Sequence, residues 1–278
     1  MKIAAYNILA GGFNGYGSAA DKPERLALLQ RAIQEIDADV IGLSDTFRWV
    51  DVFTEQEIKQ LFGYEYVSFI HMNDVRVDKR IGVAVLSRVP VERFETVRLA
   101  TRDCIKAVIS MGVTRVALYT AYLDDLAERV RVEQVQVLLE HISEDAQQGM
   151  ESIVMGDLNM LTPEDASKKE YGLDLLIEAG LDVEAVLMHD PYHKAAFDDL
   201  HAAQALPLLL GGGLVEPVGA ELHATAFTKI HELHFPFPVL RLDHIVHTAG
   251  VASSGFLVHK GGIFEEASDH YPISCQVQ

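Results

Sequence analysis

The chain has 278 residues, a length that suits one large domain or two small ones. Hydrophobic residues make up 49% of it, which is ample for a sizeable core and excludes a disordered chain. The net charge of −18, from 41 acidic and 23 basic residues, argues against a protein that binds long nucleic acid through a basic face.

The apolar runs are short, and none reaches the roughly 20 residues that a membrane-spanning helix needs. The longest candidate, residues 205–215, is interrupted by a proline and three glycines. The N-terminal run MKIAAYNILAGG superficially resembles a signal peptide, but a tyrosine and an asparagine interrupt it, so a first β-strand is expected. Because Cys104 and Cys275 are the two cysteines, no disulfide framework is implied and a cytoplasmic location is expected.

The first half of the chain predicts many strands and two helices. Residues 2–8 and 39–43 form buried strand patterns, and leucines and isoleucines at helical spacing predict a helix over 23–36. Thr54 followed by Glu57 resembles a capping box and predicts a helix over 54–62. Further strands are predicted over 64–70, 81–87, 104–110 and 116–123. Strands at this density indicate a large sheet or two packed sheets.

The second half begins with a predicted helix over 125–145 and a strand over 152–155 that ends at the run GDLN. A helix over 164–179 should end at a glycine. The stretch at about 185–238 has poor periodicity and is expected to be a surface excursion, a lid or an oligomer contact. Strands resume at 242–248, 255–259 and 271–277. With no repeat or low-complexity linker, a single domain over 1–278 with an insertion at about 185–238 is expected.

Acidic and amide residues follow strand patterns along the whole chain. Any one of them has an ordinary explanation, because Asp and Asn side chains cap turns and helix starts. Two compact patterns favour a functional reading: GDLN places an acid and an amide two residues apart after an apolar strand, and SDHYPI places an acid beside an imidazole. The residues concerned are Asn7, Asp45, Asp157, Asn159, Asp243, Asp269 and His270.

These residue types suit the hydrolysis of a phosphate ester. That reaction needs a positioned water, neutralised phosphoryl oxygens and a stabilised leaving oxygen, so positioning and electrostatics dominate it. Carboxylates and amides are ligands for Mg²⁺ or Mn²⁺. An Asp–His pair holds an imidazole in one tautomer for proton transfer or phosphate contact. Spacing alone does not show that the groups converge.

The chain resembles the endonuclease/exonuclease/phosphatase superfamily over nearly its whole length. The matching runs, in order, are MKIAAYNILAGG, ADVIGLSDT, IGVAVLSRVPV, YTAYLDD with the helix RVEQVQVLLEHI, IVMGDLN, LRLDHIV and SDHYPI. The resemblance implies a DNase I-like, four-layered α/β sandwich: two packed mixed β-sheets flanked by helices. It also implies Mg²⁺, or Mn²⁺, as the cofactor.

Site roles follow from the same resemblance, position by position. Asp157 would activate the attacking water, and Asn159 would hydrogen-bond that water or a phosphate oxygen. Asp45, Asp269 and Asn7 would hold the metal.

Two further roles concern the phosphate. Asp243 would pair with His270, which would contact it. Arg102 falls where several members place a phosphate-contacting arginine, although Arg80, Arg98 or Arg131 could supply that charge instead.

Two positions depart from the family pattern. The usual metal-binding glutamate is Asp45 here, one methylene shorter. The frequent Thr-His-Leu is Ala121-Tyr122-Leu123, which resembles the Thr-Ala-Tyr run of apurinic-endonuclease-like members, where the tyrosine donates to phosphate. Tyr122 is therefore either a phosphate ligand or an aromatic side chain packed beneath its strand.

The leading interpretation is a metal-dependent phosphodiesterase or phosphatase acting on a small phosphorylated molecule or a lipid headgroup. A DNA or RNA nuclease is the alternative, which the acidic net charge does not favour. A non-catalytic binding protein that retains the fold is the third hypothesis. The oligomeric state is left open.

Overall fold

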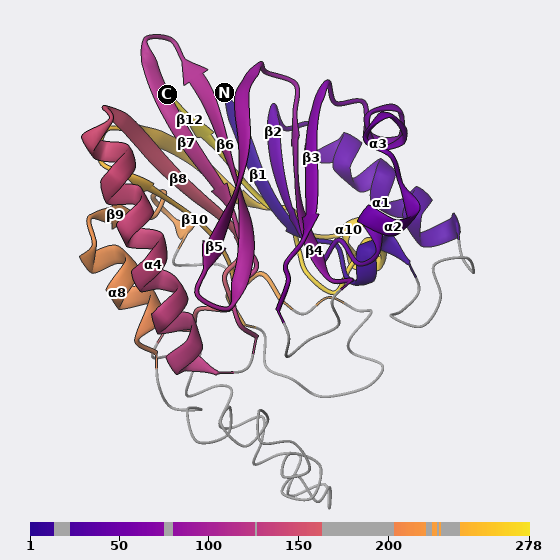
Figure 1. Cartoon of the computed structure of the whole chain (residues 1–278). Coiled ribbons are helices and arrows are strands. Elements are labelled where there is room, and N and C mark those ends of the chain that lie inside the picture. Colours follow the sequence, from indigo (N-terminus) through magenta and orange to yellow (C-terminus); the bar gives the residue numbers. More distant parts are fainter. Residues whose placement is uncertain are drawn as a thin grey trace, which may run out of the picture.

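The computed structural model describes residues 1–13, 23–74, 80–125, 127–162, 203–220, 224–226, 228 and 240–278. Two six-stranded sheets pack face to face, and helices cover the outer faces (Figure 1). The predicted four-layered α/β sandwich is therefore confirmed. Both chain ends lie together at one end of the sandwich, where the Met1 amine donates to the Val277 carbonyl at 3.0 Å.

The first sheet, sheet A, has the strand order β11-β12-β1-β2-β4-β3. In it, β1 runs parallel to β2 and antiparallel to β12. Its strands are β1 (Lys2–Asn7), β2 (Val40–Ser44), β3 (Tyr66–His71), β4 (Gly82–Ser87), β11 (Ser253–Val258) and β12 (Ile273–Val277).

The second sheet, sheet B, has the order β5-β6-β7-β8-β10-β9. Here β7 and β8 are parallel, and β10 runs antiparallel to β8. Its strands are β5 (Val91–Leu99), β6 (Arg102–Met111), β7 (Thr114–Thr120), β8 (Met150–Asp157), β9 (Leu214–Val215) and β10 (Asp243–Thr248).

Helices form the two outer layers, with α1, α2, α3 and α10 beside sheet A and α4 and α8 over sheet B (Figure 1). No helix in the described part of the chain is long and apolar enough to cross a membrane. The helices are α1 (Pro23–Ile36), α2 (Trp49–Val52), α3 (Glu55–Phe62), α4 (Glu128–Gln147), α8 (Ala205–Gly211) and α10 (Phe264–Ala267), with a short 3-10 turn, η1, at Ala10–Gly12.

The inner strands β7, β8 and β10 of sheet B are buried on both faces. In β7, Val116 and Leu118 belong to the core between the sheets, whereas Ala117 and Tyr119 pack in the cluster under α4. Strands covered on both sides carry continuous apolar sequence, since neither face meets water. This explains why these segments show no alternation of polar and apolar residues.

Strand direction gathers the polar strand ends at one edge of the sandwich. Asn7 and Ser44 pair at the ends of the parallel strands β1 and β2. Asp157 ends β8 and is paired with Asp243, which begins the antiparallel strand β10. Because the side chains of a strand alternate, Asp157 shares the inner face with Met155 and Ile153. The sheets therefore present acids and amides from distant motifs at the same edge.

The predicted helix over 54–62 is confirmed together with its cap. The Thr54 hydroxyl accepts from the Glu57 amide at 3.3 Å, and the Glu57 carboxylate accepts from the Thr54 amide at 2.8 Å. The helix predicted over 125–145 begins later, at Glu128. The Asp124 carboxylate accepts from the Ala127 amide at 2.6 Å and closes a turn before it.

The strand β5 is absent from the predicted strands because it is an edge strand whose charged residues face solvent. Residues 205–215, part of the expected surface excursion, form α8 and β9. There Leu206 and Leu209 are buried against α4, and Pro207 lies in the first turn, where a missing amide hydrogen is tolerated. The helix predicted over 164–179 and most of the 185–238 insertion lie outside the described residues.

Candidate active site

The run GDLN places Asp157 at the inner edge of sheet B. Gly156 has a φ of 140°, and a Cβ there would lie 2.0 Å from the Ala121 carbonyl oxygen, so only glycine fits. Asp157 is 2% exposed, and its Oδ2 accepts from the Asn7 side-chain amide at 2.8 Å. That bond joins sheet A to sheet B across the sandwich.

The backbone around Asp157 is also fixed. Its amide donates to the Ser44 hydroxyl at 3.1 Å, and its Oδ1 accepts from the Asn159 amide at 3.1 Å. Asn159 adopts a left-handed φ of 48° and donates from its side chain to the Leu123 carbonyl at 3.2 Å. Asp157 and Asn159 are thereby held beside the segment that follows β7.

The terminal Asp-His motif meets Asp243 and Asp157. The His270 ring has Nδ1 at 2.7 Å from Asp243 Oδ2 and Nε2 at 3.9 Å from Asp157 Oδ2. Burial alone would lower the pKa of His270, but the carboxylates of Asp243 and Asp157 raise it to about 10. The two acidic side chains therefore favour the protonated form of the His270 imidazole.

Burial also controls the protonation of Asp157. Removal from water raises the pKa of its carboxyl to about 7; Asp243 adds to the rise, while His270 and the Asn7 amide oppose it. A carboxylate with a pKa near neutrality is a stronger proton acceptor than an exposed aspartate. This suits a group that must take a proton from water.

Two buried threonines that the sequence did not indicate hold the backbone of the site: Thr225 contacts the segment of Asp243, and Thr228 contacts that of Asp269. The Thr225 hydroxyl accepts from the Leu242 and Asp243 amides, each at 3.0 Å, and its carbonyl accepts from the Tyr271 amide at 2.7 Å. The Thr228 amide donates to the Asp269 carbonyl at 2.8 Å. Both lie in the stretch with poor periodicity, where no local pattern marks them.

The residues predicted to hold a metal lie at the same edge. The Asp45 Oδ2 accepts from the Ala10 amide at 2.8 Å, and Asn7 Oδ1 accepts from the Leu9 amide at 3.0 Å. The Ser268 hydroxyl lies 2.7 Å from the Asn7 carbonyl and 3.3 Å from Asp269 Oδ1, so it connects these two residues.

The donor set fits a hard divalent cation. Asp45, Asp157, Asp243 and Asp269 are between 1% and 7% exposed. The ion pairs at Asp157 and Asp243 both go to His270. Burying several carboxylates costs several kcal/mol each unless positive charge offsets it, and oxygen donors suit Mg²⁺ or Mn²⁺. Among the described residues, Asp157, Asp243 and His270 also offer possible ligand atoms within 4.8 Å of one another.

Arg102 and Tyr122 lie together next to this edge. The Arg102 guanidinium is 5.1 Å from the centre of the half-buried Tyr122 ring. It donates to Asp74 at 3.0 Å, to Asp125 at 2.6 Å and to the Leu123 carbonyl. With 1% exposure, Arg102 is enclosed by protein acceptors.

The alternative arginines are engaged in different ways. Arg131 is buried and donates to Glu128 at 2.7 Å. Arg98 pairs with Asp103 at 3.1 Å and has a half-exposed side chain, and the Arg80 guanidinium lies 4.8 Å from the Phe47 ring centre. The contacts described for these arginines involve Asp74, Asp125, Glu128, Asp103 and Phe47, so their phosphate roles stay predictions.

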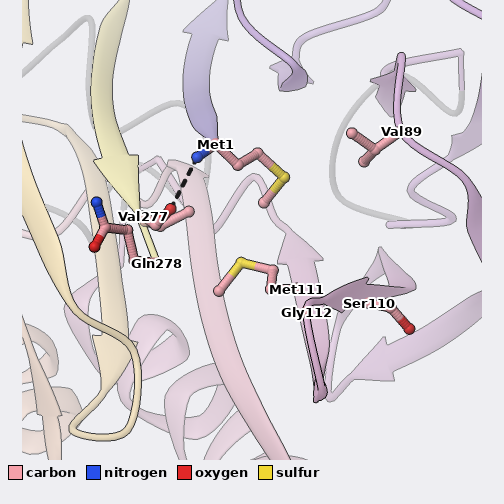
Figure 2. A pocket seen from close by; sticks show the side chains of 7 residues that line it. All are labelled: Met1, Val89, Ser110, Met111, Gly112, Val277 and Gln278. Carbon is pink, nitrogen blue, oxygen red and sulfur yellow. Dashed lines mark hydrogen bonds between the residues drawn. The ribbon is translucent and has the colours of Figure 1, made fainter.

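A pocket of about 430 Å³ lies far from these groups, at the end of the sandwich that holds the chain ends (Figure 2). Its lining carries no ionisable side chain, although the Met1 amine lies at its edge. It is lined by Met1, Val89, Ser110, Met111, Gly112, Val277 and Gln278.

The two-sheet sandwich with this acidic edge is the DNase I-like α/β fold. The chain belongs to the endonuclease/exonuclease/phosphatase family, whose profile matches residues 4–270. A search of curated protein sequences finds no match.

Solved structures share the fold over the full chain. A 3′ phosphatase from Neisseria bound to a product DNA hairpin is 19% identical, with a TM-score of 0.64 and coverage of 100% of this chain and 99% of that one. A mannosyl-6-phosphatase from Bacteroides thetaiotaomicron is 14% identical, with a TM-score of 0.62 and coverage of 100% and 99%. Truncated TDP2 from Caenorhabditis elegans is 14% identical, with a TM-score of 0.60 and coverage of 99% and 96%. At these identities the likeness shows the fold alone.

Proposed function

We propose that this protein is a phosphoesterase that uses Mg²⁺ or Mn²⁺ to hydrolyse a phosphodiester or phosphomonoester by attack of water at phosphorus. The observation that supports this most is the buried contact of Asp157 with Asn7, beside the Asp243–His270 pair. A candidate base (Asp157), a candidate cation ligand (Asn7) and an imidazole (His270) from three distant motifs therefore lie together.

Asp157 and His270 divide the proton and charge chemistry. Asp157 orients the attacking water and takes its proton, as the raised pKa of its carboxyl allows. His270, kept protonated by Asp243, donates to a phosphoryl oxygen. Asn159 hydrogen-bonds the water or the phosphate, and Tyr122 donates to the phosphate from the neighbouring strand end. As water bonds to phosphorus, the bond to the leaving oxygen breaks.

Asp45, Asp269 and Asn7 hold the cation in this proposal. Their side-chain oxygens lie at this edge and take no part in the Asp243–His270 hydrogen bond. A bound divalent cation would neutralise the phosphoryl oxygens and the developing charge on the leaving oxygen.

The proposed substrate is a small phosphorylated molecule or a lipid headgroup. The net charge of −18 opposes long polyanions, and Arg102 and Arg131 are neutralised by buried carboxylates. The second candidate function is a nuclease. It is favoured by Tyr122, which lies beside Arg102 next to the site and matches the phosphate-binding tyrosine of apurinic-endonuclease-like members. Cys104 and Cys275 are buried and free, which is compatible with the proposed cytoplasmic location.

A substrate panel tests the activity. Bis-p-nitrophenyl phosphate, p-nitrophenyl phosphate and plasmid DNA are each incubated with Mg²⁺, Mn²⁺ or EDTA. We expect cation-dependent release of nitrophenol from at least one ester and little nicking of the plasmid. Nicking that exceeds ester hydrolysis would favour the nuclease, and no turnover of any substrate would oppose the whole proposal.

Asp157→Asn tests the assigned base. Since the amide keeps the shape but cannot take a proton, kcat should fall at least about 100-fold. The melting temperature should stay within about 5 °C of wild type. Asp37→Asn is the control, because Asp37 is an exposed carboxylate paired with Arg88 at 2.5 Å, remote from the site. Full activity of Asp157→Asn would remove Asp157 from the mechanism.

A further inference from the structure

The segment after β1 has an uncommon backbone. Leu9, Ala10, Gly11 and Gly12 have φ angles of 45°, 49°, 68° and 79°, a run of four left-handed residues. Only glycine adopts such angles without strain, and a leucine and an alanine do so only where their surroundings impose it. Something in the fold therefore holds this segment, which we call the 9–12 loop.

Arg25 of α1 clamps both ends of the 9–12 loop. Its Nε donates to the Phe13 carbonyl at 2.8 Å, and its Nη2 donates to the Ile8 carbonyl at 3.0 Å and to the Leu9 carbonyl. The guanidinium is a planar fork of five donors, so it binds several carbonyls at once in a fixed geometry.

The same side chain reaches the terminal Asp-His motif. Arg25 Nη1 donates to the Ala267 carbonyl at 3.3 Å, immediately before Ser268 and Asp269. Ser268 in turn donates to the Asn7 carbonyl at 2.7 Å. One guanidinium thus ties the segment that carries Asn7 to the segment that carries Asp269, although 242 residues separate Arg25 from Ala267.

The 9–12 loop passes this constraint to Asp45. The Ala10 amide donates to Asp45 Oδ2 at 2.8 Å, and the Gly11 amide donates to the Asp45 carbonyl at 2.7 Å. Trp49 Nε1 donates to the Gly11 carbonyl at 2.9 Å from the other side. The direction of the Asp45 carboxylate therefore depends on the left-handed backbone of Ala10 and Gly11.

We propose that Arg25 is a positioning residue for the cation site: by holding the 9–12 loop and the Ala267 carbonyl, it fixes Asn7, Asp45 and Asp269 relative to one another. The inference rests on the proposed function, which assigns those three residues to the cation. Arg25 is 8% exposed and donates to backbone carbonyls, so it acts through the backbone rather than by touching substrate.

Arg25→Lys is the principal variant. A lysine keeps the charge but replaces the fork with a single ammonium, so it cannot bridge the loop and Ala267 together. Gln30→Leu is the matched control: Gln30 lies on the same helix, and its side chain donates to the Leu61 carbonyl at 2.6 Å, away from the loop. Trp49→Phe removes one hydrogen bond to the loop and leaves Arg25 in place.

The readouts are Mn²⁺ binding by titration calorimetry, amide hydrogen exchange of residues 8–13 and urea unfolding. We expect Arg25→Lys to raise the Kd for Mn²⁺ about tenfold or more, as losses of groups that orient metal ligands do, while Gln30→Leu stays within about twofold. Exchange of residues 8–13 should quicken in Arg25→Lys and not in Gln30→Leu. Trp49→Phe should weaken Mn²⁺ binding severalfold, because the loop orients Asp45. If Arg25→Lys does not fold, unchanged Mn²⁺ binding in Trp49→Phe would exclude a role for the loop and overturn the inference.

An unchanged Mn²⁺ Kd in Arg25→Lys, or an equal loss in Gln30→Leu, would overturn the inference in favour of a purely structural arginine. Wild type that binds no Mn²⁺ would overturn it as well. Failure of the proposed function would look different. Wild type would bind Mn²⁺ and Arg25→Lys would bind it more weakly, but wild type would hydrolyse no ester in the panel.

Discussion

At the scale of single residues, Arg102 carries a charge that could bind phosphate, but its side chain is buried among protein acceptors, as a structural arginine would be. Its donors go to Asp74, to Asp125 and to the carbonyl of Leu123, which also accepts from the Asn159 side chain. Arg102 can therefore influence the candidate site through Leu123 without meeting a substrate. The two roles predict different kinetics.

Arg102→Met should lower the free energy of unfolding by about 3–5 kcal/mol, because it breaks the buried ion pair between Arg102 and Asp74. Urea unfolding measures this, and Asp74→Asn, which removes the partner, should also destabilise. If Arg102 instead contacts phosphate as the sequence predicts, the KM of Arg102→Met for p-nitrophenyl phosphate would rise strongly with little loss of stability.

His259 carries a pH dependence that lies away from the candidate site. Burial, with a smaller contribution from Lys2, lowers the pKa of its imidazole to about 4, and its Nε2 lies 2.9 Å from the Ser274 hydroxyl. The unfolded chain protonates this histidine near pH 6.5 while the folded chain does not. Stability from this group is therefore full above about pH 6.5 and declines as the pH falls toward 4.

His259→Gln should flatten that decline by about 1–2 kcal/mol, a figure reduced because the side chain is partly exposed to screening solvent. Urea unfolding of both proteins at pH 7.0, 5.5 and 4.5 compares the slopes. Equal slopes in the two proteins would show that His259 does not titrate as its burial implies.

At the scale of elements, helix α4 is held to sheet B by a buried polar group under its apolar face. Lys106 of β6 pairs with Asp145 of α4, and the Tyr119 hydroxyl of β7 donates to the same carboxylate. The helix itself was predicted, whereas the polar contact beneath its buried residues Val135, Leu138 and Ile142 was not. The contact of Asp145 with Lys106 and Tyr119 fixes which turn of α4 lies over β6 and β7.

Lys106→Met should cost about 3–5 kcal/mol, because Asp145 is fully buried and would keep an uncompensated charge. Tyr119→Phe should cost only about 1 kcal/mol, the net value of one hydrogen bond. The double variant Lys106→Met with Asp145→Leu should be more stable than Lys106→Met alone. Denaturant unfolding of the three variants checks this order, and a double variant less stable than the single one would contradict it.

At the scale of the whole molecule, polar contacts join the two sheets at the candidate site. The Ser44 hydroxyl of sheet A donates to the Ala121 carbonyl at 3.3 Å and accepts from the Asp157 amide at 3.1 Å, both in the sheet B half. The Asn7–Asp157 bond is a second link. The relative position of the sheets and the geometry of the site are therefore coupled.

Ser44→Ala should cost about 1–3 kcal/mol, because the Asp157 amide loses a buried partner, and it should also slow ester hydrolysis. Ser87→Ala is the control: Ser87 is equally buried in sheet A, but its hydroxyl donates locally to the Val89 carbonyl at 2.7 Å. We expect the control to lose stability and keep its activity. Hydrolysis rates that fall equally in both variants would show that the contact between the sheets does not control the geometry of the site.

The sequence by itself determined the fold class and the family, because strand patterns and compact motifs such as GDLN and SDHYPI are local features of neighbouring residues. It also named Asn7, Asp157, Asp243 and His270, and the structure brings these together, since strand ends of parallel and antiparallel partners share one edge. Their catalytic roles stay predictions.

Only the tertiary structure decided which groups support or enclose that site. Arg25 and Thr225 carry no local signal, because their partners lie far along the chain and are mostly backbone carbonyls and amides, which every residue has. Arg102 looked available to a phosphate until the fold placed Asp74 and Asp125 against it. Such contacts depend on side chains meeting across long sequence separations, which no local pattern encodes.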